Sequence, residues 1–210
     1  MNPVQLPSRG LYAITREHYP GTAALAAAVA AAIRGGAAMV QYRAKAAADP
    51  LAAAERLQAV CRAAGVPLIV NDDLELAWRV GADGVHLGRD DAGPTEARRR
   101  LGPAAIIGVS CYDSVELAVR AEEEGADYAA FGRFFPSLTK PGAPLARLET
   151  LALAKRRVRI PLAAIGGVAP GNGGPLLEAG ADFLAVVEGV FGGDDPEASA
   201  RRYAPLFERA

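Results

Sequence analysis

The sequence predicts an α/β protein built as a single (β/α)8, or TIM, barrel. Three observations support this fold class. Eight short apolar segments typical of buried strands recur along the 210 residues, and segments of helical character separate them. Strands that are apolar throughout, each followed by a helix, indicate a parallel sheet covered by helices. Four of the strands also follow the same glycine-containing signal.

This signal reads Gly-Ala-Ala or Gly-Ala-Asp and stands directly before a strand. Its copies begin at Gly36, Gly81, Gly125 and Gly180. Glycine suits the left-handed conformation that ends a helix. The strands that follow are expected at residues 39–42, 84–87, 128–131 and 183–187. The other strands are expected at residues 11–15, 68–70, 105–109 and 162–165.

The segments between these strands combine strong helix formers with apolar residues at helical spacing. Helices are expected at residues 23–34, 50–64, 114–124 and 144–157. Asp49-Pro50 and Asp113-Ser114 resemble helix starts with an N-cap. An open doubly wound sheet is the alternative, but no Gly-x-Gly-x-x-Gly follows the first strand. Because no linker or low-complexity tract divides the chain, residues 1–210 are predicted to form one domain.

The composition limits the classes of partner. Apolar residues make up 51%, and 23 Lys and Arg against 24 Asp and Glu give a net charge of −1. This balance argues against disorder and against binding nucleic acid or an anionic membrane through a global positive field. The longest apolar run is too short to span a bilayer, and no signal peptide is recognisable. Cys61 and Cys111 lack ligand-like spacing, so a cytoplasmic protein without disulfides is expected.

Polar residues gather where the predicted strands end, which is where barrel enzymes place their active sites. Gln41, Arg43 and Lys45 alternate after the second strand and can therefore share one face. Two cations and an amide suit a ligand that carries phosphate. Taken alone, the motif is equally compatible with a solvated strand end.

Carboxylates follow the next two strands. Asp72 and Asp73 come after the third strand, and Asp91 comes shortly after the fourth. Carboxylates beside cations suggest Mg²⁺ that bridges protein and phosphate oxygens. Asp72 or Asp73 could instead cap the following helix. His86 lies within an apolar strand and is expected to be a hydrogen-bonded core histidine, so a zinc site is unsupported.

The later strand ends add further candidates for anion binding. Ser110 could bind an anion or cap the next helix, and no residue in the sequence stands out as a base for it. In the long loop at residues 132–144, the side chains of a possible phosphate-closing lid are Ser137, Thr139 and Lys140.

Two more candidate phosphate contacts follow the last two strands. Gly166-Gly167 follows the seventh strand, where barrels often bind phosphate, although a tight turn would also explain it. Near Val187, a contact through the backbone is expected, because the Glu188 carboxylate would repel phosphate.

Taken together, these motifs resemble the thiamine phosphate synthase family along nearly the whole chain. The most specific parts are Gln41-x-Arg43-x-Lys45, Val70-Asn71-Asp72, His86-Leu87-Gly88 with Asp91, Gly108-Val109-Ser110 and Pro136-Ser137-x-Thr139-Lys140. The resemblance implies a transferase that joins a pyrimidine, carried as its hydroxymethyl diphosphate, to a thiazole phosphate. The products would be thiamine phosphate and diphosphate, and the displacement would be dissociative.

The resemblance also implies a role for each matched residue. The pyrimidine diphosphate would contact Gln41, Arg43, Lys45, Asn71, Ser110 and Lys140. Mg²⁺ would be held by Asp72 and Asp91. The thiazole phosphate would contact Ser137, Thr139, Gly167 and the backbone near Val187 and Glu188. Arg43, Lys45 and Lys140 would be catalytic, because they could stabilise the charge that builds on the leaving diphosphate. The chain departs from the family pattern at Ala44, Arg89 and Glu188-Gly189.

Two other functions fit the same barrel. Thiazole tautomerase relatives would not need the metal ligands and would be expected to carry a histidine where Cys111-Tyr112 stands. A non-catalytic phosphate-binding barrel would not explain the pair of carboxylates. The expected partners are small-molecule substrates, with neither nucleic acid nor membrane, and a homo-oligomer is compatible with the sequence.

Overall fold

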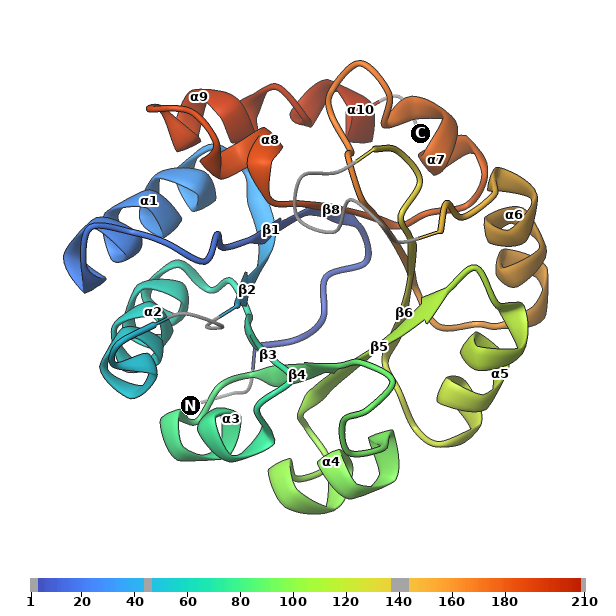
Figure 1. Ribbon diagram of the computed structural model, residues 1–210, viewed down its shortest axis with the longest axis horizontal. Coiled ribbons are helices and arrows are strands. Elements are labelled where there is room, and N and C mark those ends of the chain that lie inside the picture. Colours follow the sequence, from blue (N-terminus) through green and yellow to red (C-terminus); the bar gives the residue numbers. More distant parts are fainter. Residues whose placement is uncertain (1–3, 44–46, 137–143, 209–210) are drawn as a thin grey trace.

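The computed structural model describes residues 4–43, 47–136 and 144–208. Within these residues, eight parallel strands pair in chain order, and the last strand pairs with the first to close a barrel. Figure 1 looks down this barrel and shows the helices as an outer ring. No described helix is both long enough and apolar enough to cross a membrane. The predicted (β/α)8 fold is confirmed.

Each strand lies within a few residues of its predicted position. The strands are β1 (Gly10–Ile14), β2 (Ala37–Tyr42), β3 (Leu68–Asn71), β4 (Gly84–Leu87), β5 (Ile106–Tyr112), β6 (Tyr128–Gly132), β7 (Leu162–Ile165) and β8 (Phe183–Val186). The helices are α1 (Thr22–Arg34), α2 (Pro50–Ala64), α3 (Leu74–Val80), α4 (Pro94–Leu101), α5 (Val115–Glu123), α6 (Leu148–Arg157), α7 (Gly174–Glu178), α8 (Glu188–Phe191), α9 (Pro196–Arg201) and α10 (Ala204–Glu208).

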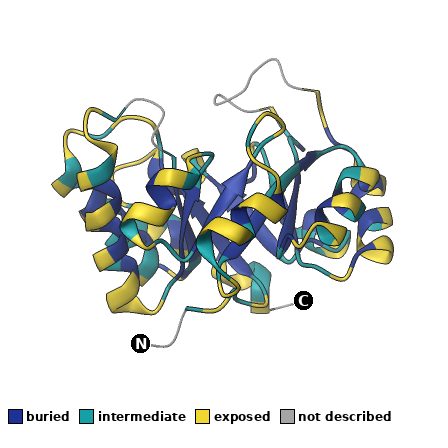
Figure 2. Ribbon diagram, turned by 90° about the horizontal axis from the view of Figure 1, so that it is seen from below, coloured by how far each residue is buried: buried dark blue, intermediate teal, exposed yellow. Residues whose placement is uncertain are grey.

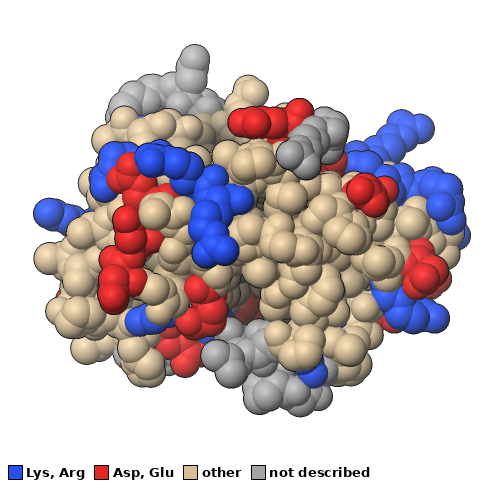
Figure 3. Space-filling view, turned by 90° about the horizontal axis from the view of Figure 1, so that it is seen from above, with Lys and Arg blue, Asp and Glu red and all other residues tan. Residues whose placement is uncertain are grey.

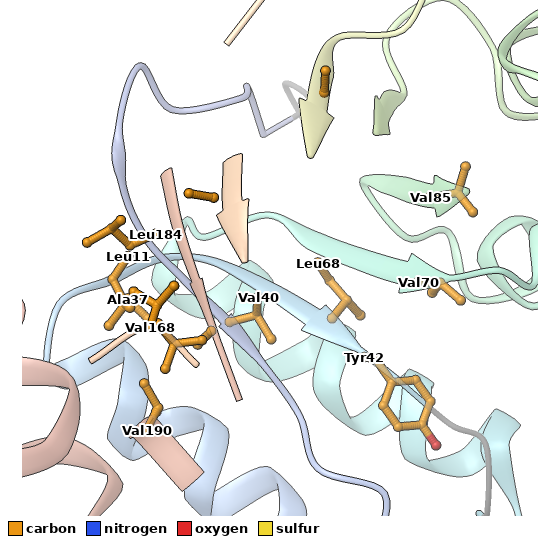
Figure 4. Close-up of a cluster of buried hydrophobic side chains, with 14 of the residues drawn as sticks. Leu11, Ala37, Val40, Tyr42, Leu68, Val70, Val85, Val168, Leu184 and Val190 are labelled. Carbon is orange, nitrogen blue, oxygen red and sulfur yellow. The ribbon is translucent and has the colours of Figure 1, made fainter. Parts of the chain in front are cut away.

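Strand alternation divides the core into two parts. One set of side chains points outward against the helices, and Figure 4 shows Val40, Leu68 and Val85 among them. The other set fills the barrel interior and includes Tyr12 and Tyr128. Figure 2 shows the buried strands in the middle of the molecule and the exposed outer faces of the helices. Side chains two residues further along a strand from these inward-facing residues lie on the same face. Polar side chains at such positions, near the carboxyl ends of the strands, therefore point into the mouth of the barrel.

The repeated glycine signal has a structural reason that extends beyond the glycine. Gly81 has φ 60° in the left-handed region, and the other three copies also have positive φ. The aspartate of the signal binds the backbone of a neighbouring strand. Asp83, Asp127 and Asp182 each accept a hydrogen bond from a strand amide, at 2.7–2.9 Å. Each Gly-Ala-Asp therefore ends one helix and ties the start of a strand to its neighbour.

The predicted helix at residues 144–157 was wrong at its start, because α6 begins at Leu148. The preceding segment is held by other loops: the Ala146 amide donates to the Arg133 carbonyl at 2.7 Å, and the Arg147 amide donates to Asp113 at 3.0 Å. Asp113 consequently does not cap α5, whose N-cap is Ser114. The cap predicted at the start of α2 is confirmed, since Asp49 accepts from the Ala52 amide at 3.0 Å.

Charged residues of both signs share the molecular surface. Figure 3 shows Lys and Arg side chains beside Asp and Glu side chains on one face. Several form exposed ion pairs, such as Arg34 with Glu197 at 2.8 Å and Lys155 with Asp182 at 2.7 Å. Such pairs contribute little to stability. Their interspersed signs agree with the near-zero net charge of the sequence.

Candidate active site

Four polar side chains point into the barrel mouth from successive strands. Gln41, Asn71, His86 and Ser110 lie on β2, β3, β4 and β5, in phase with the inward-facing core residues below them. The strand register places Asn71 opposite His86. The structure therefore brings together the predicted site residues of the second, third and fifth strands.

A chain of hydrogen bonds connects Gln41, His86 and Ser110 through the barrel interior. Gln41 Nε2 donates to Tyr12 Oη at 2.7 Å, and the hydroxyls of Tyr12 and Tyr128 are 2.7 Å apart. Tyr128 Oη lies 2.9 Å from His86 Nδ1, and His86 Nε2 lies 2.9 Å from Ser110 Oγ. Both ring nitrogens of His86 thus have partners, as expected for a core histidine. The structure also supplies Ser110 with a neighbouring imidazole that sequence reasoning did not identify.

Arg43 lies just after β2 and is fixed at both its backbone and its side chain. Its amide donates to Thr15 Oγ1 at 2.9 Å. Its guanidinium forms an ion pair with Glu17 at 2.5 Å, and its side chain is 13% exposed. Glu17 therefore belongs to the surroundings of the site, although the sequence did not indicate it. Lys45, the other predicted cation of this motif, lies outside the described residues.

The two aspartates after β3 have different structural roles. Asp73 is the N-cap of α3, and its Oδ1 accepts from the Leu76 amide at 2.8 Å. Asp72 does not cap this helix. It has φ 63°, a left-handed conformation uncommon for residues other than glycine. Its amide donates to the His86 carbonyl at 2.8 Å, which ties it to β4. The alternative that Asp72 is a cap is thereby excluded, and Asp72 remains a candidate metal ligand.

Asp91 follows the adjacent strand β4. Its Oδ2 accepts from the Gly88 amide at 2.6 Å, which fixes the carboxylate at the start of the β4–α4 loop. Beside Asp91 and Ser110 lies a cavity of about 290 Å³ between α4 and α5. Among the described residues, no three His, Cys, Asp or Glu side chains form a metal-binding cluster.

Gly166 and Gly167 are required by packing. They have φ 98° and 65°. A Cβ on Gly166 would lie 2.2 Å from Arg133 Cβ, and one on Gly167 would lie 2.4 Å from the Pro136 carbonyl oxygen. The loop after β6 thus lies directly against the turn after β7. Pro136 is the last residue described before the gap, so the predicted lid side chains Ser137, Thr139 and Lys140 lie outside the described residues.

Glu188 lies at the end of β8, where the sequence predicted a phosphate contact through the backbone. Val187 is the N-cap of the short helix α8, and Glu188 is its first residue. The Glu188 carboxylate is directed along the helix, since its Oε2 lies 2.9 Å from the position of a Cβ built on Gly192. An acidic side chain placed in this way leaves the backbone as the part of Glu188 that could contact an anion.

The two cysteines are unsuited to nucleophilic chemistry. Both are free and buried. Burial raises the pKa of Cys61 to about 12 and that of Cys111 to about 12. Since the thiolate is the reactive form, neither thiol is activated.

A parallel barrel with an arginine, two carboxylates and inward-facing amide and hydroxyl groups at its strand ends is typical of barrel enzymes that act on phosphate-bearing substrates. Residues 11–190 match the family model for thiamine monophosphate synthase, so the chain belongs to that family. The predicted thiamine-phosphate synthase activity, a transferase reaction, is therefore confirmed along with the fold.

Individual relatives agree with this assignment. The chain is 57% identical over 203 residues to a thiamine-phosphate synthase of Methylococcus capsulatus, covering 96% of this chain and 90% of the relative. It is 53% identical over 200 residues to that of Thiobacillus denitrificans, covering 94% of each. A solved thiamine phosphate pyrophosphorylase from Pyrococcus furiosus superposes with a TM-score of 0.85 at 32% identity, covering 96% of both chains. A 3-hexulose-6-phosphate synthase, with a TM-score of 0.68, 18% identity and coverage of 92% and 98%, shares the fold.

Proposed function

We propose that this barrel joins an aminopyrimidine, carried as its hydroxymethyl diphosphate, to thiazole phosphate and releases thiamine phosphate and diphosphate. The observation that carries the proposal is the set of inward-facing polar residues on β2, β3 and β5, at positions expected to bind the diphosphate substrate. The substrates are small molecules. We expect the reaction to take place in the cytoplasm, where two buried free thiols would stay reduced.

The diphosphate would be bound by Gln41, Arg43, Asn71 and Ser110, together with Lys45 and Lys140 from outside the described residues. Arg43 supports this role because it is nearly buried and held by Glu17 at one guanidinium nitrogen. Its planar fork can grip two oxygens at once, and a diphosphate offers such pairs. Glu17 then orients Arg43 before the ligand arrives.

Asp72 and Asp91 would hold Mg²⁺ jointly with the diphosphate. The fit rests on the donor set: Mg²⁺ prefers hard oxygen ligands and usually takes one or two protein carboxylates beside substrate phosphates. Asp91 is oriented by the Gly88 amide, and Asp72 is not used as a helix cap. When bound, Mg²⁺ would neutralise charge on the diphosphate oxygens.

The displacement of diphosphate requires mainly that the two substrates are positioned and that the charge on the leaving diphosphate is stabilised. The C–O bond to the diphosphate breaks, and the thiazole nitrogen forms the new C–N bond to the pyrimidine methylene. The electron-rich aminopyrimidine can stabilise cation character at this methylene, so no covalent enzyme intermediate is required. Arg43, Lys45 and Lys140 would stabilise the leaving diphosphate, and the closed geometry of the barrel would align the two substrates.

The thiazole phosphate would bind opposite the diphosphate, at Gly167 and the backbone of Val187 and Glu188, with Ser137 and Thr139. Two observations support this position. The chain enters the undescribed part of the loop at Pro136, whose carbonyl oxygen lies beside Gly167. The Glu188 carboxylate is directed along α8, so its charge is not aimed at the barrel axis.

Calorimetric titration of the pyrimidine diphosphate tests the site and the metal together. We expect tight binding with Mg²⁺ and much weaker binding after EDTA treatment. Identical binding under both conditions would overturn the metal assignment. Arg43→Ala and Lys140→Ala should weaken this titration and leave the titration of thiazole phosphate unchanged. A Lys140→Ala variant with wild-type affinity for the diphosphate would remove Lys140 from the site.

A further inference from the structure

We propose that the hydrogen-bonded chain in the barrel interior fixes Ser110 as a donor toward the bound ligand, with Tyr12, Tyr128 and His86 as positioning residues. The chain runs from Gln41 on β2 across the barrel to Ser110 on β5, and each of its links is 2.7–2.9 Å long. Its members lie on five different strands. Each inner member donates to one neighbour and accepts from the other. Reversing the hydrogen bond at one end would therefore reverse every link.

The direction of the chain follows from its first donor. An amide nitrogen can only donate, so Tyr12 accepts from Gln41. The Tyr12 hydroxyl then donates to Tyr128 Oη, and the Tyr128 hydroxyl donates to His86 Nδ1. His86 must carry its proton on Nε2 and donate it to Ser110 Oγ. The hydroxyl hydrogen of Ser110 is left to point into the site.

The opposite direction leaves a group unsatisfied. If Tyr128 donated to Tyr12, the Tyr12 oxygen would accept twice and its own hydrogen would need another acceptor. Among the residues that the structure describes, the hydroxyl of Tyr12 is hydrogen-bonded to Gln41 and Tyr128. Tyr12 is 1% exposed, so an unmade hydrogen bond there would be costly.

The surrounding packing keeps the links in place. A Cβ on Gly108 would lie 2.0 Å from Tyr128 Cζ, so only glycine leaves room for the Tyr128 ring against β5. The rings of Tyr128 and His86 stack with centroids 5.6 Å apart, and those of Tyr12 and Tyr128 meet edge to face at 5.8 Å. Burial raises the pKa of both phenols well above the ordinary value. Both hydroxyls therefore keep the hydrogens that the chain requires.

The consequence for the ligand is a defined pattern of donor and acceptor. Ser110 offers a hydrogen to an acceptor atom of the substrate. The side-chain amide oxygen of Gln41, which these hydrogen bonds do not use, offers an acceptor to an N–H group. An aminopyrimidine diphosphate has both kinds of partner. This identification of the ligand rests on the proposed function, whereas the direction of the chain does not.

The tautomer of His86 in the ligand-free protein tests the direction. The sequence has two histidines, so a His18→Gln variant leaves His86 alone in a long-range ¹H–¹⁵N spectrum of ¹⁵N-labelled protein at pH 8. His18 is exposed and lies outside the chain of hydrogen bonds. The two ring nitrogens differ in their couplings to the ring protons, which shows where the proton resides. We expect the Nε2–H tautomer, and the Nδ1–H tautomer would overturn the proposal.

A Gln41→Glu substitution tests whether Gln41 sets the direction. A carboxylate only accepts, so Tyr12 would donate to it and the whole chain would reverse. His86 should then change to the Nδ1–H tautomer. Tyr128→Phe removes the link between Tyr12 and His86. The Gln41→Glu/Tyr128→Phe double variant should therefore show the same His86 tautomer as Tyr128→Phe alone. An unchanged tautomer in Gln41→Glu would refute control by Gln41.

A binding measurement connects the chain to the ligand. Tyr128→Phe keeps the ring but removes the donor to His86, and we expect about tenfold weaker binding of the pyrimidine diphosphate with unchanged binding of thiazole phosphate. Wild-type affinity would show that Ser110 needs no fixed direction. An Nδ1–H tautomer of His86 would not affect the proposed function. Conversely, an absence of thiamine phosphate formation would not affect the inferred direction of the hydrogen bonds.

Discussion

Replacing Asp72 by Asn separates a metal ligand from a helix cap at adjacent positions. Asn tolerates the left-handed conformation that Asp72 adopts at φ 63°, so the backbone need not change. We expect the free energy of unfolding to stay within about 0.5 kcal/mol of the wild-type value. Alanine is a poorer choice, because a left-handed alanine costs about 1–2 kcal/mol and would obscure the comparison.

Asp73→Ala is the matched control. It removes the hydrogen bond that Asp73 Oδ1 accepts from the Leu76 amide, at 2.8 Å. Loss of such a cap costs about 0.5–2 kcal/mol. For a chain of this length, each kcal/mol lowers the melting temperature by about 2–4 °C. The control should therefore be less stable than Asp72→Asn, while its dependence on Mg²⁺ should remain that of the wild type.

The assay is the rate of thiamine phosphate formation as a function of Mg²⁺ concentration, alongside thermal unfolding of each variant. Loss of a hydrogen-bond partner of a metal ligand typically weakens metal affinity about 10–100-fold. Asp72→Asn removes the charge of a ligand itself, so its Mg²⁺ requirement should rise by at least this factor. A wild-type Mg²⁺ requirement in Asp72→Asn would refute the assignment. A shifted requirement in Asp73→Ala would show that the two roles had been interchanged.

Three further outcomes follow from the packing. Asp127→Ala should lose about 1–3 kcal/mol of stability in urea unfolding, because a strand amide loses its acceptor, and retain wild-type turnover. Unchanged stability would contradict the role of the Gly-Ala-Asp signal. Cys61 and Cys111, each with a pKa of about 12, should resist a thiol reagent at pH 8 until the protein is denatured, and rapid labelling of native protein would refute their burial. Gly108→Ala should displace Tyr128 and cost about 1–3 kcal/mol, and a normal melting temperature would contradict the close contact.

Local sequence patterns were sufficient to predict the strands and to place several polar residues at their ends. Apolar runs and glycine signals depend on a few neighbouring residues, and each polar motif directly follows its strand. The start of α6 was mispredicted because its preceding residues bind Arg133 and Asp113, contacts that no helix propensity contains. Similarly, the sequence could not choose between Asp72 and Asp73 as the cap, since the choice depends on backbone angles.

The interior hydrogen bonds show the limit of prediction most clearly. Tyr12 and Tyr128 are 116 residues apart in the chain, and both lie in apolar strands where an aromatic residue suggests only packing. Their contact depends on closure of the barrel. One local signal was present: Gly108 stands where an inward-facing side chain is expected, which indicates that another residue occupies that space.

The coupling reaction itself is the decisive assay for the proposed activity of this barrel. Purified protein is incubated with the pyrimidine diphosphate, thiazole phosphate and Mg²⁺, and the products are quantified by chromatography. The proposed chemistry predicts equal amounts of thiamine phosphate and diphosphate, and none of either in EDTA. If no thiamine phosphate formed while the thiazole phosphate was isomerised, the barrel would be acting as a tautomerase and not as a synthase.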